Sequence, residues 1–197
     1  MSATQATKQV ELENTNRWST RQLVTMALMC AIAALFSFIQ IPLLLAAPFL
    51  TYDPSLMPAM VCGFAFGPGA GFVVGSIAAV IHGLILGEWV GSLMNICATL
   101  FFVVPSALIY KKKHTLKGAI LGLIVGVVCA TVGAIVTNLT IGVAFWYGSA
   151  DVIMPLLLPA VVPFNLIKTV LNSLLTLIVY KAISNLITPK KNQVKGR

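Results

Sequence analysis

Residues 163–181 read PFNLIKTVLNSLLTLIVYK, a mostly apolar run with one lysine inside it and another at its end. A run of about 20 residues is long enough to cross the hydrocarbon core of a membrane as a helix. Lys168 lies inside this run, and Asn165 and Asn172 are spaced so that all three side chains share one helix face. A cation at membrane depth is costly, so Lys168 is a candidate functional residue whose charge needs a partner.

The composition extends this interpretation to nearly the whole chain. Of the 197 residues, 58% are hydrophobic and only 9% are charged, which excludes a water-soluble domain of ordinary composition. We expect an all-α membrane protein whose first apolar run is a retained helix rather than a signal peptide. Its six transmembrane helices are expected at roughly residues 20–44, 56–67, 70–87, 91–110, 117–145 and 156–184. The second is short for a membrane span, and the fifth is long enough to contain a kink near Asn138.

The distribution of charge predicts the orientation. Twelve of the thirteen Lys and Arg residues lie at or before the start of the first helix, in the 111–117 loop, or at and beyond the end of the sixth. Because short loops rich in Lys and Arg stay in the cytoplasm, we expect both termini inside. Residues 1–19 are then a cytoplasmic polar tail, residues 20–187 the six-helix substrate-binding domain, and residues 188–197 a cytoplasmic basic tail. The Pro-containing stretch AAPFLTYDPS at 46–55 becomes an external loop between the first two helices, packed back over the bundle.

Several function classes are excluded or disfavoured by the residues present. The net charge of +8 fits this topology and attraction to anionic lipid, with no nucleic acid as a partner. The sequence has no phosphate-binding loop and no serine nucleophile elbow, so we expect no catalytic residues and no ATP hydrolysis by the chain itself. His82 and Glu88 are too few for a metal site. The four cysteines, each alone in an apolar run, are interpreted as small apolar residues of the core.

The charge of Lys168 has two possible explanations at this point. One is a ligand pocket that opens to the outside, because the residue is expected in the outer half to the middle of the membrane. The other is a structural ion pair with Asp151 or Glu88, or a side chain that extends to the interface. Asn95 on the fourth helix is a further inward-facing polar candidate, with an interhelical hydrogen bond as its simpler explanation.

Three stretches carry a resemblance that extends over nearly the whole chain after residue 20. They are YDPSLMPAMVCGFAFGPGAG at 52–71, LIYKKKHTLKGAILGLIVG at 108–126 and the PFNLIKTVLNSLLTLIVYK run. Together they resemble the riboflavin-specific S components of energy-coupling factor (ECF) vitamin transporters. The resemblance implies a multi-pass protein of the bacterial cell membrane that captures riboflavin outside, with no cofactor of its own. It also implies, as partners, a transmembrane coupling protein and two ATPase subunits that power release.

The resemblance implies roles for individual residues. Asn165 and Lys168 are expected to hydrogen-bond the polar edge of the isoalloxazine ring. The other candidates for substrate binding are Asn95, Asn172, Tyr52 and Asp53. Aromatic residues near the expected external ends could line or cover the same slot, although aromatic belts are the ordinary explanation for them: Phe49, Tyr52, Trp89, Trp146 and Tyr147.

The first helix carries an expected docking surface. Ala27 and Ala31 are four residues apart and Ala34 extends the stripe, a spacing that lets helices approach closely in lipid. In the family this face docks on the coupling protein. The stretch NLTIGVAFW at 138–146 departs from the family pattern, which leaves the role of Asn138 open and leaves room for another vitamin such as pantothenate or folate. A structural or enzymatic small membrane protein is the alternative from another class.

Overall fold

The structure is a computed structural model that describes residues 18–45 and 47–187. Most of the tails expected at 1–19 and 188–197 therefore lies outside the described residues. The helices are α1 (Thr20–Ser37), α2 (Leu56–Phe66), α3 (Pro68–Leu86), α4 (Trp89–Lys112), α5 (Leu116–Thr137), α6 (Ala150–Leu156) and α7 (Val162–Ile187). Two π-helical segments, η1 (Asn138–Tyr147) and η2 (Leu157–Val161), flank α6, and the short strands β1 (Ile41–Pro42) and β2 (Thr51–Tyr52) form a hairpin.

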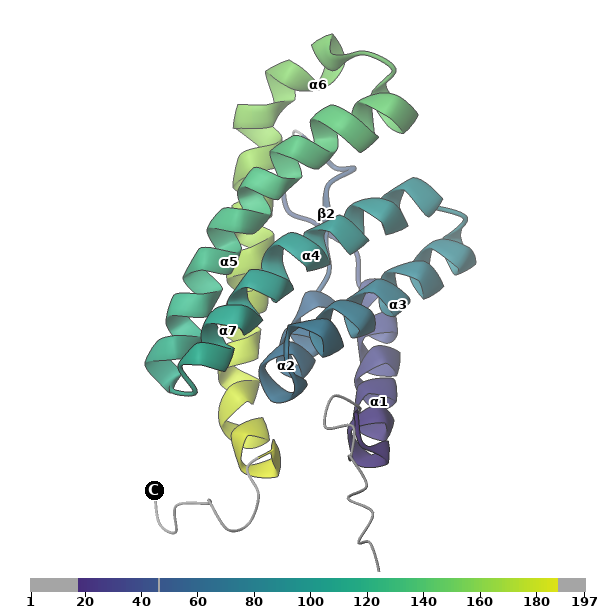
Figure 1. The fold of residues 1–197 in the computed structure, drawn as a ribbon. Coiled ribbons are helices and arrows are strands. Elements are labelled where there is room, and N and C mark those ends of the chain that lie inside the picture. The colour runs from purple at the N-terminus through teal and green to yellow at the C-terminus, as the bar shows by residue number, and fades with distance from the viewer. Residues whose placement is uncertain (1–17, 46, 188–197) are drawn as a thin grey trace, which may run out of the picture.

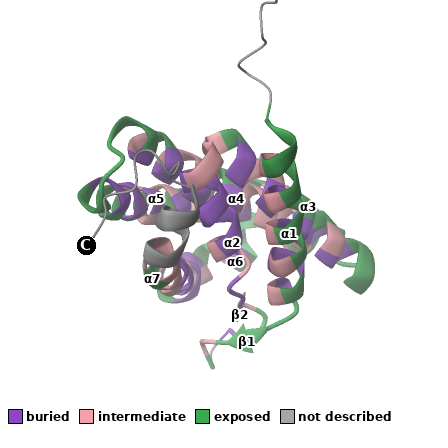
Figure 2. Cartoon of the chain, turned by 90° about the horizontal axis from the view of Figure 1, so that it is seen from below, coloured by how far each residue is buried: buried purple, intermediate pink, exposed green. Residues whose placement is uncertain are grey.

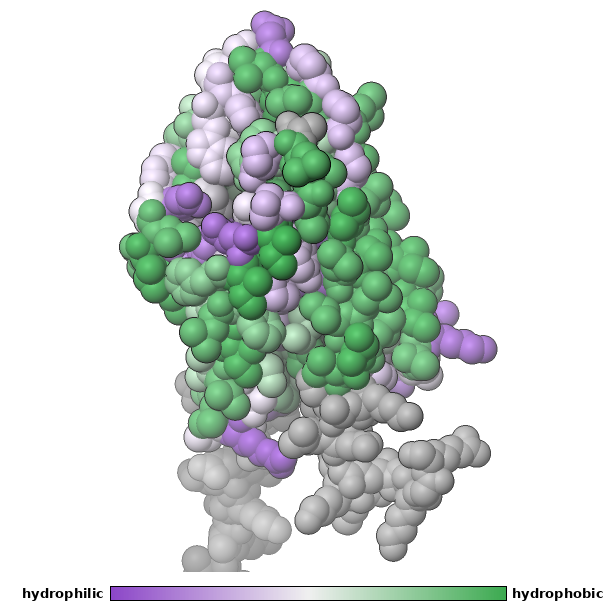
Figure 3. Space-filling view, turned by 180° about the vertical axis from the view of Figure 1, so that it is seen from behind, coloured by the Kyte–Doolittle hydropathy of each residue, from purple (hydrophilic) through white to green (hydrophobic). Residues whose placement is uncertain are grey.

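Five helical stretches are long and apolar enough to cross a membrane. They are Thr20–Ser37, Pro68–Leu86, Trp89–Lys112, Leu116–Tyr147 and Ala150–Tyr180. The second expected helix, at 56–67, is present as α2, but with 11 residues it is shorter than the roughly 20 that a span requires. In the space-filling view, hydrophobic residues cover most of the flanks of the visible face, as expected of a surface in contact with lipid (Figure 3).

The first helix ends earlier than the sequence predicted. We expected it to reach residue 44, but α1 ends at Ser37 and the chain turns into the β1–β2 hairpin. Pro42 explains part of this, because proline donates no backbone hydrogen bond and favours an extended conformation in the residue before it. Ile41 pairs with Tyr52 across the hairpin. Seen from below, β1 lies exposed at the rim of the bundle, whereas the buried residues gather where the helices meet (Figure 2).

The last two helical stretches, Leu116–Tyr147 and Ala150–Tyr180, each contain a segment that is not regular α-helix. The change from α5 to η1 falls at Asn138, which agrees with the kink expected near this residue. The final stretch begins at Ala150 rather than at residue 156. Its prolines, Pro155, Pro159 and Pro163, follow one another at intervals of four residues, and each removes one donor from the helical ladder. The helix is irregular over η2, between the first and the last of them.

Small residues allow the central helices to approach closely. A Cβ at Gly71 of α3 would lie 2.6 Å from Val103 Cγ1 and 2.7 Å from the backbone oxygen of Ala59. A Cβ at Gly122 of α5 would lie 2.6 Å from the backbone oxygen of Ser106 on α4. Close approach of this kind is how helices gain packing energy in lipid, where apolar side chains have no preference for one another over the acyl chains.

The bundle has two distinct ends. The start of α1, the α2–α3 turn, the α4–α5 loop and the end of α7 lie at one end, and α6 lies at the other (Figure 1). At the first end, the hydroxyls of Tyr110 on α4 and Tyr180 on α7 are 2.6 Å apart and join the two helices. The β1–β2 hairpin lies on the α6 side of α2, so the hairpin and the short helix follow each other along the bundle (Figure 1).

We predict that Gly122→Ala destabilises the protein by about 1–3 kcal/mol, because the added methyl group meets backbone rather than a movable side chain. Gly69→Ala is the matched control, since its Cβ would lie 3.9 Å from the nearest atom, Trp18 Cζ2. Thermal unfolding of the two variants in detergent measures the difference. Equal melting temperatures would show that α4 and α5 can separate without cost.

Candidate functional site

The buried lysine of α7 is paired with an aspartate from the far side of the chain. Lys168 Nζ lies 2.7 Å from Asp53 Oδ2, and the two side chains are only 8% and 9% exposed. Asp53 follows β2 directly, so the loop after the hairpin inserts a carboxylate between the helices. The sequence analysis named Asp151 and Glu88 as possible structural partners of Lys168. Both were wrong, because Lys168 pairs with Asp53 and the two other acids are exposed. Asp151 instead accepts a hydrogen bond from Ser149 Oγ at 3.2 Å.

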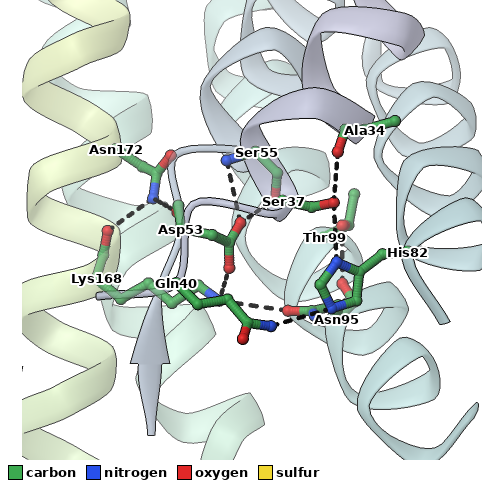
Figure 4. Close-up of polar contacts among 10 residues, drawn as sticks. All are labelled: Ala34, Ser37, Gln40, Asp53, Ser55, His82, Asn95, Thr99, Lys168 and Asn172. Atoms are coloured by element: carbon green, nitrogen blue, oxygen red, sulfur yellow. Dashed lines mark hydrogen bonds and ion pairs between the residues drawn. The ribbon is translucent and has the colours of Figure 1, made fainter. Parts of the chain in front are cut away.

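Further hydrogen bonds hold the carboxylate of Asp53 in place. Its Oδ1 accepts from the backbone N–H of Ser55 at 3.1 Å and also from the hydroxyl of Ser55. Asn172, one helical turn beyond Lys168, donates from Nδ2 to the backbone oxygens of Asp53 at 3.1 Å and Lys168 at 3.0 Å. These contacts satisfy both carboxylate oxygens and fix the loop against α7 (Figure 4).

Lys168 also reaches a third element. Its Nζ donates to Asn95 Oδ1 on α4 at 3.3 Å. An ammonium group has three protons, and the contacts among the described residues use two of them. One proton is therefore left for a ligand.

A cavity of about 100 Å³ lies beside this ammonium group. Asn165 reaches it from α7, one turn before Lys168, and donates from Nδ2 to the backbone oxygen of Val161 at 2.8 Å. Its Oδ1 and second amide proton have no other partner among the described residues. The lining also includes Asn95, Thr137, Asn138, Leu50, Met94 and Phe164. The cavity therefore combines an apolar wall with a few placed donors and acceptors, which is the usual construction of a small-molecule site.

The six residues predicted to bind substrate divide into two groups. Asn165, Lys168 and Asn95 line the cavity. The other three, Asp53, Asn172 and Tyr52, are buried outside its lining, with Asn172 fully buried at 0% exposure. Asp53 and Asn172 act on Lys168 and the loop after β2, because the carboxylate of Asp53 and the Nδ2 of Asn172 bond to protein atoms. The buried Oδ1 of Asn172 has no hydrogen-bond partner among the described residues.

Tyr52 is buried in β2, directly before Asp53. Its place in β2 brings its neighbour Asp53 into the bundle, and we assign it no contact with a ligand.

Asn138 is a cavity residue whose role the sequence left open. It lies at the start of η1, where the helix widens, and π-helical segments are frequent at functional sites. Its Nδ2 donates to Ala134 O at 2.8 Å, and its Oδ1 accepts from the Tyr147 hydroxyl at 3.1 Å. The only sequence signal for this position is a lone asparagine in a long apolar run.

A second cavity of about 400 Å³ lies toward the α6 end. Three of the five predicted aromatic residues, Phe49, Trp89 and Trp146, line it together with Glu88. Tyr147 bonds to Asn138 instead, and Tyr52 is buried. Phe49 lines the second cavity and Leu50 the first, so consecutive residues of the β1–β2 hairpin each line one of the two cavities.

The expected docking stripe on α1 is shorter than predicted. Ala27 and Ala31 are exposed, as a docking surface requires. Ala34 is only 7% exposed and belongs to the hydrophobic core with Ala33 and Cys30. The helical spacing alone placed Ala34 with the other two, but its neighbours in the fold cover it.

His82 and Glu88, the pair considered for metal binding, have different surroundings in the structure. His82 is buried, with Nδ1 3.0 Å from Ser37 Oγ and Nε2 3.3 Å from Gln40 Nε2. These contacts join α3 to the end of α1 and the start of the hairpin. Among residues 18–45 and 47–187, no group of three or more His, Cys, Asp or Glu side chains is arranged to hold a metal ion.

We predict that Lys168→Met lowers the free energy of unfolding by about 3–5 kcal/mol, because it leaves the buried carboxylate of Asp53 without its cation. The double variant Lys168→Met/Asp53→Asn should regain most of this loss, since both charges are then absent. Thermal unfolding of the detergent-solubilised variants measures both effects. A double variant less stable than the single one would contradict a charge-based explanation.

Comparison with known proteins places this geometry in a family. The family model described as ECF transporter, substrate-specific component, matches residues 21–180. The chain is 28% identical over 177 residues to the riboflavin transporter RibU of Staphylococcus aureus strain TCH60, covering 86% of this chain and 94% of that protein. It is 26% identical over 159 residues to the riboflavin transporter FmnP of Bacillus subtilis strain 168, covering 75% of this chain and 84% of that protein.

A solved structure supports the same assignment. The S component of a bacterial ECF transporter matches this fold with a TM-score of 0.73 and 29% sequence identity, over 86% of this chain and 98% of that one. The family is a transporter component, in agreement with the prediction that the chain is a multi-pass membrane protein and not an enzyme. The chain therefore belongs to the substrate-specific components of ECF transporters.

Proposed function

We propose that this chain captures riboflavin outside the bacterial cell and delivers it inward together with an ATP-driven ECF module. The observation that carries the proposal is the cavity in which Lys168, Asn165, Asn95 and Asn138 meet beside apolar side chains. The relatives in Staphylococcus aureus and Bacillus subtilis are both riboflavin transporters by name, which supports the same ligand.

The polar groups suit the edge of a flavin. The pyrimidinedione edge of the isoalloxazine ring presents carbonyl acceptors on either side of one N–H donor. The free amide proton and Oδ1 of Asn165 match a carbonyl and that N–H, and the remaining proton of Lys168 matches the second carbonyl. Asn95 also has side-chain amide protons to donate, since the only described hydrogen bond of its side chain is the one that Oδ1 accepts from Lys168.

The size of the cavity indicates that the ligand needs more space than this conformation gives. About 100 Å³ is below the roughly 300–1,000 Å³ that is typical of small-molecule sites. The second cavity of about 400 Å³ is lined by Phe49, the neighbour in sequence of Leu50 in the first cavity. We infer that the hairpin loop at Phe49 and Leu50 moves outward when riboflavin enters, while Asp53 stays paired with Lys168, and that this movement joins the two cavities and brings the aromatic residues to the ligand.

We infer the orientation and the number of crossings from the distribution of charge and the lengths of the helices. The inferred arrangement has six crossings, with both termini in the cytoplasm. The exposed Lys111, Lys112, Lys113 and Lys117 all lie in or beside the α4–α5 loop, at the end where α1 starts, and such loops stay inside. The short α2 crosses only part of the membrane, and the β1–β2 hairpin, which lies beyond it on the α6 side, completes this crossing (Figure 1). This arrangement opens the aromatic cavity to the outside and brings the lysines to anionic lipid.

The partners proposed from the family are a transmembrane coupling protein and two ATPase subunits. Ala27 and Ala31 are exposed on α1 and give a helix of the coupling protein room for close approach. Ala34 is left out of this surface because it is buried. We further propose that residues 20–187 form the substrate-binding domain, between the two tails at 1–19 and 188–197.

We predict saturable quenching of riboflavin fluorescence by the purified protein, and weaker binding by Asn165→Ala. A lost neutral hydrogen bond of about 0.5–1.5 kcal/mol corresponds to a roughly two- to tenfold rise in Kd. Thr140→Val is the control, because this exposed threonine of η1 does not line the cavity. Tight binding of pantothenate or folate in place of riboflavin would refute the ligand and leave the family assignment intact.

We also predict that Ala27→Leu or Ala31→Leu reduces riboflavin uptake by cells while the isolated protein binds riboflavin normally. The larger side chains should hold the coupling protein's helices apart. Ala31→Ser keeps the small volume and should transport normally. Loss of binding in the leucine variants would instead assign the two alanines to packing within the bundle.

A further inference from the structure

The lysine at the wall of the cavity is a cation whose charge is already compensated. Its Nζ lies 2.7 Å from Asp53 Oδ2, and neither side chain is more than 9% exposed. Ser55 occupies the second oxygen of the same carboxylate through its N–H and its hydroxyl. The carboxylate therefore stays on the ammonium group without any contact to a ligand.

This pairing changes what the cavity attracts. A lone ammonium group in a medium of low dielectric constant attracts any carboxylate or phosphate strongly, because the interaction is hardly screened. A close ion pair presents only a dipole, whose attraction falls off faster with distance. The remaining ammonium proton is still available as a hydrogen-bond donor to a neutral carbonyl.

The other charges at the α6 end act in the same direction. Among the described residues, the charged side chains there besides the ion pair are Glu88 and Asp151, and both are acidic and exposed. Glu88 lines the second cavity. A negatively charged ligand would therefore meet a carboxylate in the outer cavity and a compensated lysine in the inner one.

We propose that Asp53 determines the specificity of the site. By compensating the charge of Lys168, it makes the inner cavity select a neutral hydrogen-bonding edge and disfavour a carboxylate or phosphate placed next to Lys168. This inference rests on the proposed function in that riboflavin supplies such an edge. Pantothenate is a small molecule that ends in a carboxylate, so the same residue disfavours the binding of that end at Lys168.

The test replaces Asp53 and measures the response to a small anion. In Asp53→Asn, the uncompensated Lys168 should recruit chloride, so the Kd for riboflavin should rise about tenfold or more when sodium gluconate is replaced by sodium chloride. Gluconate serves as the matched salt because, unlike chloride, it is too large for the cavity of about 100 Å³ in this ligand-free conformation. The wild-type Kd should change by less than about twofold, because its cation is already paired.

A second variant distinguishes charge from shape. Asn95 accepts from the same ammonium group at 3.3 Å, so Asp53→Asn/Asn95→Asp returns a carboxylate to Lys168 from the opposite side. This double variant should again be insensitive to chloride. Lys168→Met/Asp53→Asn has no cation and should be insensitive as well. If Asp53→Asn does not fold, a folded and chloride-insensitive Asp53→Asn/Asn95→Asp supports the proposal, and a double variant that is unfolded or chloride-sensitive overturns it.

A measurement without flavin separates this inference from the proposed function. Chloride, compared with gluconate, should raise the melting temperature of Asp53→Asn and leave that of the wild type unchanged. Absence of riboflavin binding by the wild type would overturn the proposed ligand, while the melting temperatures would still decide the role of Asp53. Chloride competition in the wild type, or an Asp53→Asn variant indifferent to chloride, would overturn the inference.

Discussion

The ion pair between Lys168 and Asp53 sets the arrangement on which the rest of the site depends. The two residues are 115 positions apart, and they meet at 2.7 Å. A buried charge without a partner is expensive, so α7 cannot keep its lysine inside the bundle unless the loop after β2 enters from the other side. The hairpin, the start of α2 and α7 are therefore positioned together. Removing either charge should disturb all three.

The polar residues of α7 have different roles according to their position along the helix. Asn172 is fully buried and ties the backbone of Asp53 to α7, so it supports the pair from one side. Asn165 lies one turn away on the other side and faces the cavity with free hydrogen-bonding groups. Lys168, between them, has both roles: two of its ammonium protons are donated to Asp53 and Asn95, and the third is available to a ligand. One face of α7 thus holds the ion pair in place at Asn172 and offers hydrogen-bonding groups to a ligand one turn before Lys168, at Asn165.

Hydropathy and helical periodicity predicted the features that depend on local sequence. The long apolar runs, the short α2, the change of geometry at Asn138 and the inward face of Asn165 and Lys168 all follow from spacing within one segment. The partner of Lys168 could not be found in this way, because hydropathy does not show that a polar loop folds back between helices. The same limit explains Ala34, whose spacing matches an exposed stripe although its neighbours in the fold bury it.

The compensated lysine also bears on how a vitamin can leave such a site. A ligand that neutralised Lys168 with its own charge would expose an unpaired cation inside the membrane each time it was released, at a cost of several kcal/mol. A neutral ligand exchanges only hydrogen bonds, each of which contributes about 0.5–1.5 kcal/mol net. Under the proposed role of Asp53, the ion pair stays intact before capture, during binding and after release. Tight recognition and repeated release are compatible in this protein because the charge of Lys168 is balanced within the chain itself.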